Sequence, residues 1–370
     1  MKKVIFALAA VVALAACSQE DVIVADKGAA VGFDTFVENS TRSVYDPSFT
    51  NDENKMFSDF AVYGYVNGAV LLDGVRVAKD GDGMKADDYA GQTKTGWKYE
   101  GTQYWIANAN YNFNAVAPMT NGNWEKTAAT AESTTLLFTN NGTTDLLYAY
   151  ATAVGANKNN DVVGFNFRHV LSKVKFSFKN EYNATNATIR VENVKIHDAY
   201  ASGSVVLNDK TAWTPAENSN TLALEFGNAA VGSATAEEPF ANGKTVESYK
   251  ELLMIPGQGA STYTVTNADA TTTEYKNVYK VTFNVVLLVS GQEIDTYEHT
   301  IYTTFAPKAG ERYNLKAVIN ATNIDPEHAQ EPIEFTVTNI TDWDEDHDGK
   351  ENTEAGDTDG DNQVDTEFVI

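Results

Sequence analysis

The chain has 370 residues, and its 51 acidic side chains against 27 basic ones give a formal net charge of −24. That charge disfavours nucleic-acid binding, because a protein that neutralises phosphates needs a basic surface. One cysteine excludes a disulfide-stapled fold, so the fold must rest on buried apolar surface. A chain of this length predicts about two domains.

The beginning of the chain has the pattern of an export signal. Two lysines precede an apolar stretch from Val4 to Ala16, which is shorter than the roughly 20 residues needed to cross a bilayer. Cys17 directly follows Leu-Ala-Ala, an arrangement that resembles a bacterial lipobox. We predict a lipoprotein signal peptide over 1–16, a lipidated Cys17 and a tether over 17–30. The alternative is an ordinary signal peptide with a chance cysteine.

Short strands with alternating apolar residues follow. The first is expected from Val31 to Val37, with Val31, Phe33, Thr35 and Val37 on one face. Turns rich in Asp, Gly and Asn separate the later ones. Further strands are expected over Phe60–Val66, Trp97–Tyr99, Tyr104–Ile106, Tyr111–Val116, Thr134–Phe138, Asp145–Ala151, Ala187–Ile196, Gly203–Leu207, Thr221–Phe226, Tyr263–Thr266, Val278–Val289, Thr296–Thr304, Tyr313–Ile319 and Ile333–Ile340.

The longest alternating segment runs from Phe165 to Phe178, with a slip near Leu171. At about 3.3 Å per residue it would extend over about 40 Å, which is long for one strand, so we expect it to pass from one domain to the next. The sequence therefore predicts an all-β protein of two β-sandwiches in series, over 31–168 and 169–343. An acidic tail over 344–370 follows.

The acidic tail has the composition of a calcium-binding segment or of a solvated spacer. Three of its aspartates and Gly349 match the first, third, fifth and sixth positions of an EF-hand loop, but the twelfth position is Ala355. A second series has the ligand spacing with Asn362 at the bend. We favour calcium; the spacer is the alternative. The candidate ligands are Asp344, Asp346, Asp348, Asp357, Asp359, Asp361 and Asp365.

Signals for catalysis are weak, so we predict that the protein is not an enzyme. The five histidines show no metal-ligand spacing, and no nucleophile motif or phosphate loop is present. His169 is expected to be structural, and Trp97, Tyr104 and Trp105 to pack in a core rather than line a sugar-binding surface. The histidines are His169, His197, His299, His328 and His347.

Several segments in order resemble the fimbrillin family, the type V pilins whose precursors are outer-membrane lipoproteins. Each segment is weak alone, but together they extend over most of the chain and follow the lipobox. They are Trp97, Tyr104-Trp105, Tyr111-Asn112-Phe113-Asn114-Ala115-Val116-Ala117-Pro118, Phe167-Arg168-His169-Val170-Leu171-Ser172-Lys173-Val174-Lys175-Phe176, Leu253-Met254-Ile255-Pro256, Ala309-Gly310-Glu311-Arg312-Tyr313-Asn314-Leu315 and Phe335-Thr336-Val337-Thr338-Asn339-Ile340-Thr341-Asp342-Trp343.

The resemblance implies two transthyretin-like β-sandwich domains and a subunit of an adhesive surface fibre. It implies anchoring in the outer membrane through the N-terminal lipid, and removal of the first strand by an arginine-specific surface protease, here between Arg42 and Ser43. A strand from another fimbrial subunit would then fill the opened groove. The donor is expected near the C-terminus, with Val364, Thr366, Phe368 and Ile370 on one face.

The same residues also have simpler interpretations. Arg42 would otherwise be a solvated turn residue, and the last residues a frayed end. The alternative function is a surface lipoprotein that does not polymerise and binds a glycan or a host protein. A surface hydrolase is the third hypothesis, because paired carboxylates for glycoside cleavage meet only in three dimensions.

Titration of the isolated tail with calcium tests the cation hypothesis. We expect saturable binding that is lost when Asp344, Asp346 and Asp348 are replaced by Asn, because the carboxylates that would hold the ion are gone. Isothermal titration calorimetry measures this directly. A flat titration of the unmodified tail would remove calcium from consideration.

Overall fold

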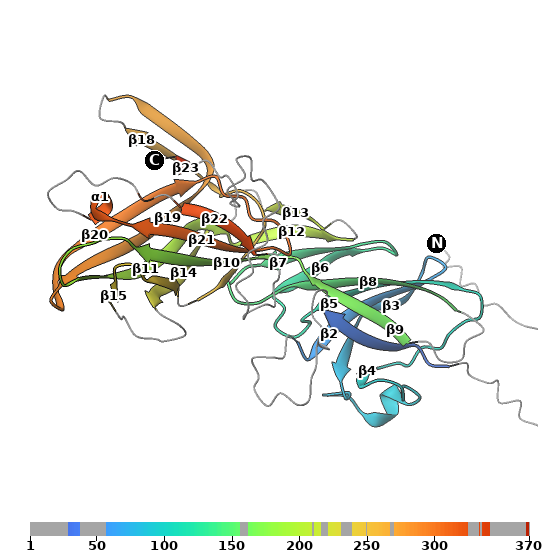
Figure 1. The fold of residues 1–370 in the computed structure, drawn as a ribbon. Helices are drawn as coiled ribbons and strands as arrows, with labels where there is room; N and C mark the ends of the chain where they lie inside the picture. Colours follow the sequence, from blue (N-terminus) through green and yellow to red (C-terminus); the bar gives the residue numbers. More distant parts are fainter. Residues whose placement is uncertain are drawn as a thin grey trace, which may run out of the picture.

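The computed structural model describes residues 29–37, 57–155, 162–208, 211–215, 221–230, 239–248, 250–266, 270–324, 333, 335–340 and 368–369. Almost all regular elements are strands, which confirms the all-β prediction (Figure 1). The helical elements in these ranges are two single turns, Ala86–Tyr89 and Ala321–Ile324 (α1). No helix in the described part of the chain is long and apolar enough to cross a bilayer.

The first sheet has seven strands in the order β1-β9-β8-β5-β2-β3-β4. Its core is aromatic, because alternate residues of β1, β2, β4, β5 and β9 point to one side of the curved sheet. The bounds are β1 Gly32–Val37, β2 Asp59–Val66, β3 Ala69–Lys79, β4 Trp97–Tyr99, β5 Asn110–Ala117, β8 Leu147–Val154 and β9 Val162–His169.

The second sheet has twelve strands, with the main order β22-β21-β10-β16-β14-β11-β19-β20-β23. It encloses the largest core, in which Phe176 and Phe178 of β10 pack on Phe335 of β22. The bounds are β10 Ser172–Asn180, β11 Ala187–Tyr200, β14 Thr221–Ala230, β15 Phe240–Ala241, β16 Thr245–Ser248, β17 Leu252–Met254, β18 Ser261–Thr266, β19 Thr272–Val289, β20 Gln292–Thr303, β21 Arg312–Ile319, β22 Phe335–Ile340 and β23 Phe368–Val369.

A third, four-stranded sheet lies between the other two and takes strands from both halves of the chain (Figure 1). Its order is β13-β12-β7-β6, with β6 Trp124–Ala129, β7 Thr134–Thr139, β12 Ser202–Leu207 and β13 Ala212–Pro215. A separate core joins this sheet to the outer face of the seven-stranded sheet and to β17. The division of the chain into two domains at 168/169 stays a prediction.

The segment expected as one long strand from Phe165 to Phe178 is two strands. β9 belongs to the first sheet and β10 to the second, and Val170 and Leu171 between them are fully buried in the joining core. The slip in the alternation near Leu171 therefore marks the crossing between sheets. Each of the two strands has a parallel neighbour, β1 beside β9 and β21 beside β10.

Several sequence expectations need correction. Tyr104–Ile106 is not a strand; Tyr104 takes part in an isolated β-bridge with Ala30. In contrast, β3 was not anticipated, although it pairs along the whole of β2, and β6, β13, β15, β16 and β17 were not anticipated either. Register shifts in that pairing and the positive φ of Gly74 break the two-residue alternation that identifies strands in a sequence.

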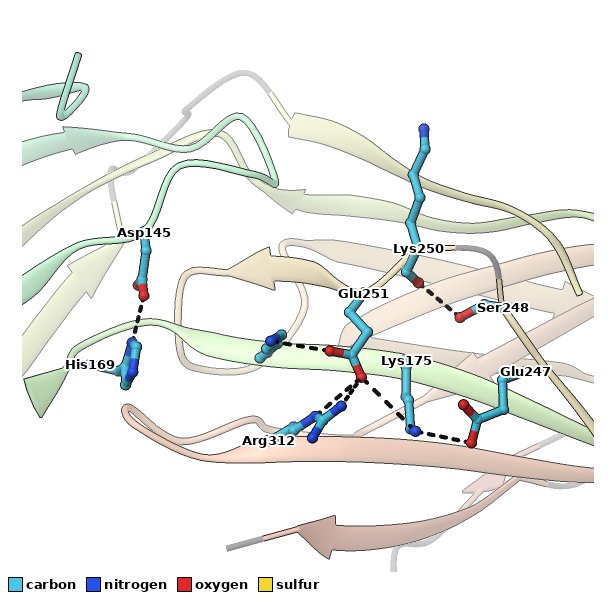
Figure 2. A network of polar contacts seen from close by, with 9 residues as sticks. Asp145, His169, Lys175, Glu247, Ser248, Lys250, Glu251 and Arg312 are labelled. Atoms are coloured by element: carbon cyan, nitrogen blue, oxygen red, sulfur yellow. Dashed lines mark hydrogen bonds and ion pairs between the residues drawn. The ribbon is translucent and has the colours of Figure 1, made fainter. Parts of the chain in front are cut away.

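An ion-pair network flanks β10 just beyond the crossing (Figure 2). The guanidinium of Arg312, a residue only 4% exposed, contacts Glu251 through Nη2 at 2.5 Å and through Nε at 3.1 Å. Lys173 Nζ lies 3.2 Å from the other oxygen of Glu251, and Lys175 Nζ lies 2.9 Å from Glu247. These contacts connect β10, β16 and β21 to the chain preceding β17.

Loss of the Glu251 carboxylate should destabilise this region. We expect Glu251→Gln to lower the free energy of unfolding by about 3 kcal/mol, because it removes the charge that compensates a buried guanidinium. Glu181→Gln is the matched control: Glu181 pairs with Lys179 at 2.6 Å, but both side chains are about half exposed, so the cost should stay below about 1 kcal/mol. Urea unfolding measures both, and equal losses would contradict the prediction.

Candidate functional site

The first strand completes the core of the seven-stranded sheet. β1 pairs in parallel with β9 from Gly32↔Val162 to Val37↔Phe167. Val31 and Phe33 are fully buried and Thr35 is 2% exposed. The predicted strand and the shared face of these three residues are therefore confirmed. β1 is an edge strand: among the strands that the structure describes it has a ladder with β9 alone, so its departure would break one ladder.

The Phe33 side chain lies in a cage of three aromatic rings from three other strands. Its ring centroid is 5.4 Å from that of Tyr99 on β4, 5.6 Å from that of Phe113 on β5 and 5.5 Å from that of Phe165 on β9. Full burial of such a side chain contributes about 1.5–3 kcal/mol, and aromatic pairs add to that. Phe33 is thus the principal side-chain anchor of β1.

The chain just before β1 is held from the other side as well. The Val31 amide donates to the Gln103 carbonyl at 2.9 Å, and the Trp105 amide donates to the Ala29 carbonyl at 3.0 Å. Ala30 and Tyr104 form the bridge between these bonds. The last two residues of the predicted tether thus contact the segment after β4.

Tyr99 fixes the beginning of β1 through its hydroxyl. The hydroxyl donates to the Val31 carbonyl at 3.0 Å and accepts a hydrogen bond from the Gln103 amide at 3.0 Å. Gln92 in turn holds the Tyr99 backbone, with its amide donating to the Tyr99 carbonyl at 2.7 Å and its carbonyl accepting from the Tyr99 amide at 3.0 Å. Burial raises the pKa of Tyr99 to about 12, so the hydroxyl stays protonated at neutral pH.

Sequence reasoning found the strand but missed this clamp. Tyr99 was identified only as part of an aromatic strand, and Gln92 and Gln103 were not identified at all. Tyr99 and Val31 are 68 residues apart, and no local pattern reports a contact at that separation. The only available signal was the aromatic content of the segments that the family resemblance uses.

Removal of β1 would leave a groove with defined chemistry. The edge of β9 would present unpaired N–H and C=O groups, the aromatic cage would be empty, and the Tyr99 hydroxyl would lose its acceptor. An open edge beside an apolar groove is the arrangement that binds an added strand.

Most of the other predicted site residues lie outside the described residues. These are Cys17, Arg42, Ser43, the donor residues Val364, Thr366 and Ile370, and the seven candidate calcium ligands Asp344, Asp346, Asp348, Asp357, Asp359, Asp361 and Asp365. Phe368 is described, in β23. It pairs antiparallel with β20, as Thr303↔Phe368 and Tyr302↔Val369.

The aromatic residues weighed for sugar binding lie in or beside the core. Trp97 is 3% exposed and packs on Phe57 and Phe60, and Trp105 packs edge-on against Tyr111. These contacts confirm core packing for Trp97 and Trp105.

The described histidines have structural surroundings. His169 is buried, and its Nδ1 lies 2.5 Å from a carboxylate oxygen of Asp145 on the chain preceding β8 (Figure 2). His299 stacks on Phe283, and burial lowers its pKa to about 4, which keeps the ring neutral. Within the ranges that the structure describes, no three acidic, histidine or cysteine side chains converge as a metal site. The burial of His169 and its contact with Asp145 agree with the structural role predicted from the sequence.

Comparison with known proteins identifies the class. The sequence matches the fimbrillin-like family over residues 41–343, and the chain belongs to that family. No curated protein matches it significantly. Membership supports a fimbrial or adhesive role at the cell surface, and a structural rather than a catalytic one.

A solved structure shares the fold. A fimbrial protein from Bacteroides vulgatus is 14% identical, with 83% of this chain and 98% of that chain covered and a TM-score of 0.55. The fimbrial anchor protein Mfa2 from Porphyromonas gingivalis is 11% identical, with 84% and 97% covered and a TM-score of 0.34. At these identities the likeness to the first structure concerns the fold alone.

Replacement of Tyr99 by Phe tests the clamp. The variant keeps the ring against Phe33 but loses both hydroxyl hydrogen bonds, so we expect local opening of β1 to become easier by about 1–2 kcal/mol. Amide hydrogen exchange over residues 29–37 should then speed up roughly 5- to 30-fold.

Tyr279→Phe is the matched control, because that buried hydroxyl donates to the Gly257 carbonyl at 2.9 Å in the other large sheet. It should leave exchange over 29–37 unchanged. Equal exchange of this segment in Tyr99→Phe and the unmodified chain would show that the hydroxyl does not hold β1.

Proposed function

We propose that this chain is a fimbrial subunit that assembles on the cell surface by exchange of its first strand. The observation that carries the proposal is the position of β1. It is the first described strand of the chain and lies at the edge of its sheet, with a ladder to β9, yet its Phe33 side chain is fully buried in the core. A subunit that loses β1 has a strong physical reason to bind another strand in its place.

Processing is proposed at Arg42–Ser43, which follow β1 in the sequence. A cut there by an arginine-specific surface protease would separate the segment from Cys17 to Arg42, β1 included, from the rest of the chain. Before the cut, lipid on Cys17 would hold the subunit at the outer membrane. After the cut, the subunit would belong to the fimbrium and contribute to adhesion.

The energetics favour replacement of β1 rather than a stable empty groove. Val31 and Phe33 each contribute about 1.5–3 kcal/mol by burial, so their loss alone would cost about 3–6 kcal/mol. That is a large share of the 5–15 kcal/mol by which folded proteins are stable. A strand from another fimbrial subunit would restore the lost burial, and the proposed donor contains Val364, Thr366, Phe368 and Ile370. Calcium in the acidic tail would stiffen the connection to that donor.

Controlled proteolysis tests the proposal. We expect a trypsin-like protease to cut the folded precursor after Arg42 and the product to form a ladder of oligomers on a denaturing gel run without heating. Arg42→Gln is the matched control: it should not be cut after residue 42, and the protein should remain monomeric.

Deletion of 364–370 should not prevent cleavage after Arg42. It should abolish the ladder of oligomers if copies of this chain donate the strand to one another. A product that stays monomeric after complete cleavage would contradict assembly by strand exchange and favour a surface lipoprotein that acts without polymerising.

A further inference from the structure

The groove of β1 has side-chain requirements that can be compared with the proposed donor, and this comparison rests on the proposed function. The buried positions are an apolar residue at Val31, just before β1, a ring at Phe33 and a small polar residue at Thr35. In the sequence alternation Val37 comes next, and its backbone pairs with Phe167. The cage of Tyr99, Phe113 and Phe165 makes the second of these positions specific for a flat ring.

The tail contains one aromatic residue between 344 and 370, which is Phe368. If Phe368 takes the place of Phe33, the donor segment can run either in the same direction as β1 or in the opposite direction. Read backwards, the alternate residues are Ile370, Phe368, Thr366 and Val364, which match Val31, Phe33, Thr35 and Val37 in character at every position. Read forwards, Thr366 would occupy the fully buried Val31 position and Ile370 the Thr35 position.

We infer that the groove is built to receive residues 364–370 of a second copy of this chain in the direction opposite to β1. The parallel β1–β9 pair is then replaced by an antiparallel pair, with Phe368 in the aromatic cage and Glu367 beside Gly164. Antiparallel pairing is slightly more stable per residue than parallel pairing, so this difference favours the exchanged state over the original one. The segment also forms a strand within its own chain, where Phe368 and Val369 pair antiparallel with β20.

The reversed direction can be fixed by a disulfide. Gly164 is exposed on the outer face of β9, a Cβ there would meet no atom within 4 Å, and its partner in the present register is Asp34. In the reversed direction the Asp34 position is taken by Glu367, whereas in the forward direction it is taken by Val369. Directly opposed residues of an antiparallel pair are about 4.5–5.5 Å apart at Cα, within the range of a disulfide.

The experiment uses the full chain with Cys17→Ser, cut after Arg42 and allowed to assemble. With Gly164→Cys and Glu367→Cys we expect most of the ladder to become disulfide-linked under mild oxidation. The matched pair Gly164→Cys and Val369→Cys should remain unlinked. Linkage of the second pair instead of the first, or of neither pair within an intact ladder, overturns the inferred direction while the proposed function stands.

Substitution of the ring gives a second readout. Phe368→Ala should abolish the ladder, because the aromatic cage stays empty, while Val369→Ala, on the opposite face of the segment, should keep it. A ladder of unchanged length in Phe368→Ala overturns the inferred register. The absence of any ladder from the cut chain without these substitutions overturns strand exchange itself, and the inference with it.

Discussion

The seven-stranded sheet depends on the burial of Phe33 among Tyr99, Phe113 and Phe165. These rings come from β9 beside β1, from the central strand β5 and from β4 at the opposite edge, so one side chain of β1 contacts strands across the sheet. The hydroxyl of Tyr99 then fixes the backbone of the same segment. A short strand with few ladder bonds thereby contributes disproportionately to the core.

The position of β1 confines the effect of its loss. Its described buried side chains belong to the core inside the seven-stranded sheet, whereas the core that joins the halves of the chain lies on the opposite face of that sheet and contains none of the β1 side chains that the structure describes. The two halves are also held by the β7–β12 ladder. Loss of β1 would therefore empty part of one core and leave the connection to the twelve-stranded sheet in place on the other face, which is what the proposed exchange requires.

Two sheet edges are partly covered by other segments of the chain. The start of β1 is covered by residues 103–105, and the β20 edge is partly covered by β23. Uncovered strand edges are sites of uncontrolled association, and coverage by the chain's own segments guards against it. The proposed function requires that the cover formed by β1 be removed in a controlled way.

The alternation of apolar and polar residues determined most of the strands, the buried face of β1 and the change of sheet near Leu171. Alternation failed at β3, where bulges and Gly74 interrupt it, and at Tyr104–Ile106, whose aromatic residues pack without forming a strand. Only the tertiary structure decided that β1 lies parallel to β9, that β7 pairs with β12 and that Tyr99 reaches Val31. The physical reason is that local periodicity reports which side of a strand is buried, whereas the neighbour of that strand is chosen by contacts between residues far apart in the chain.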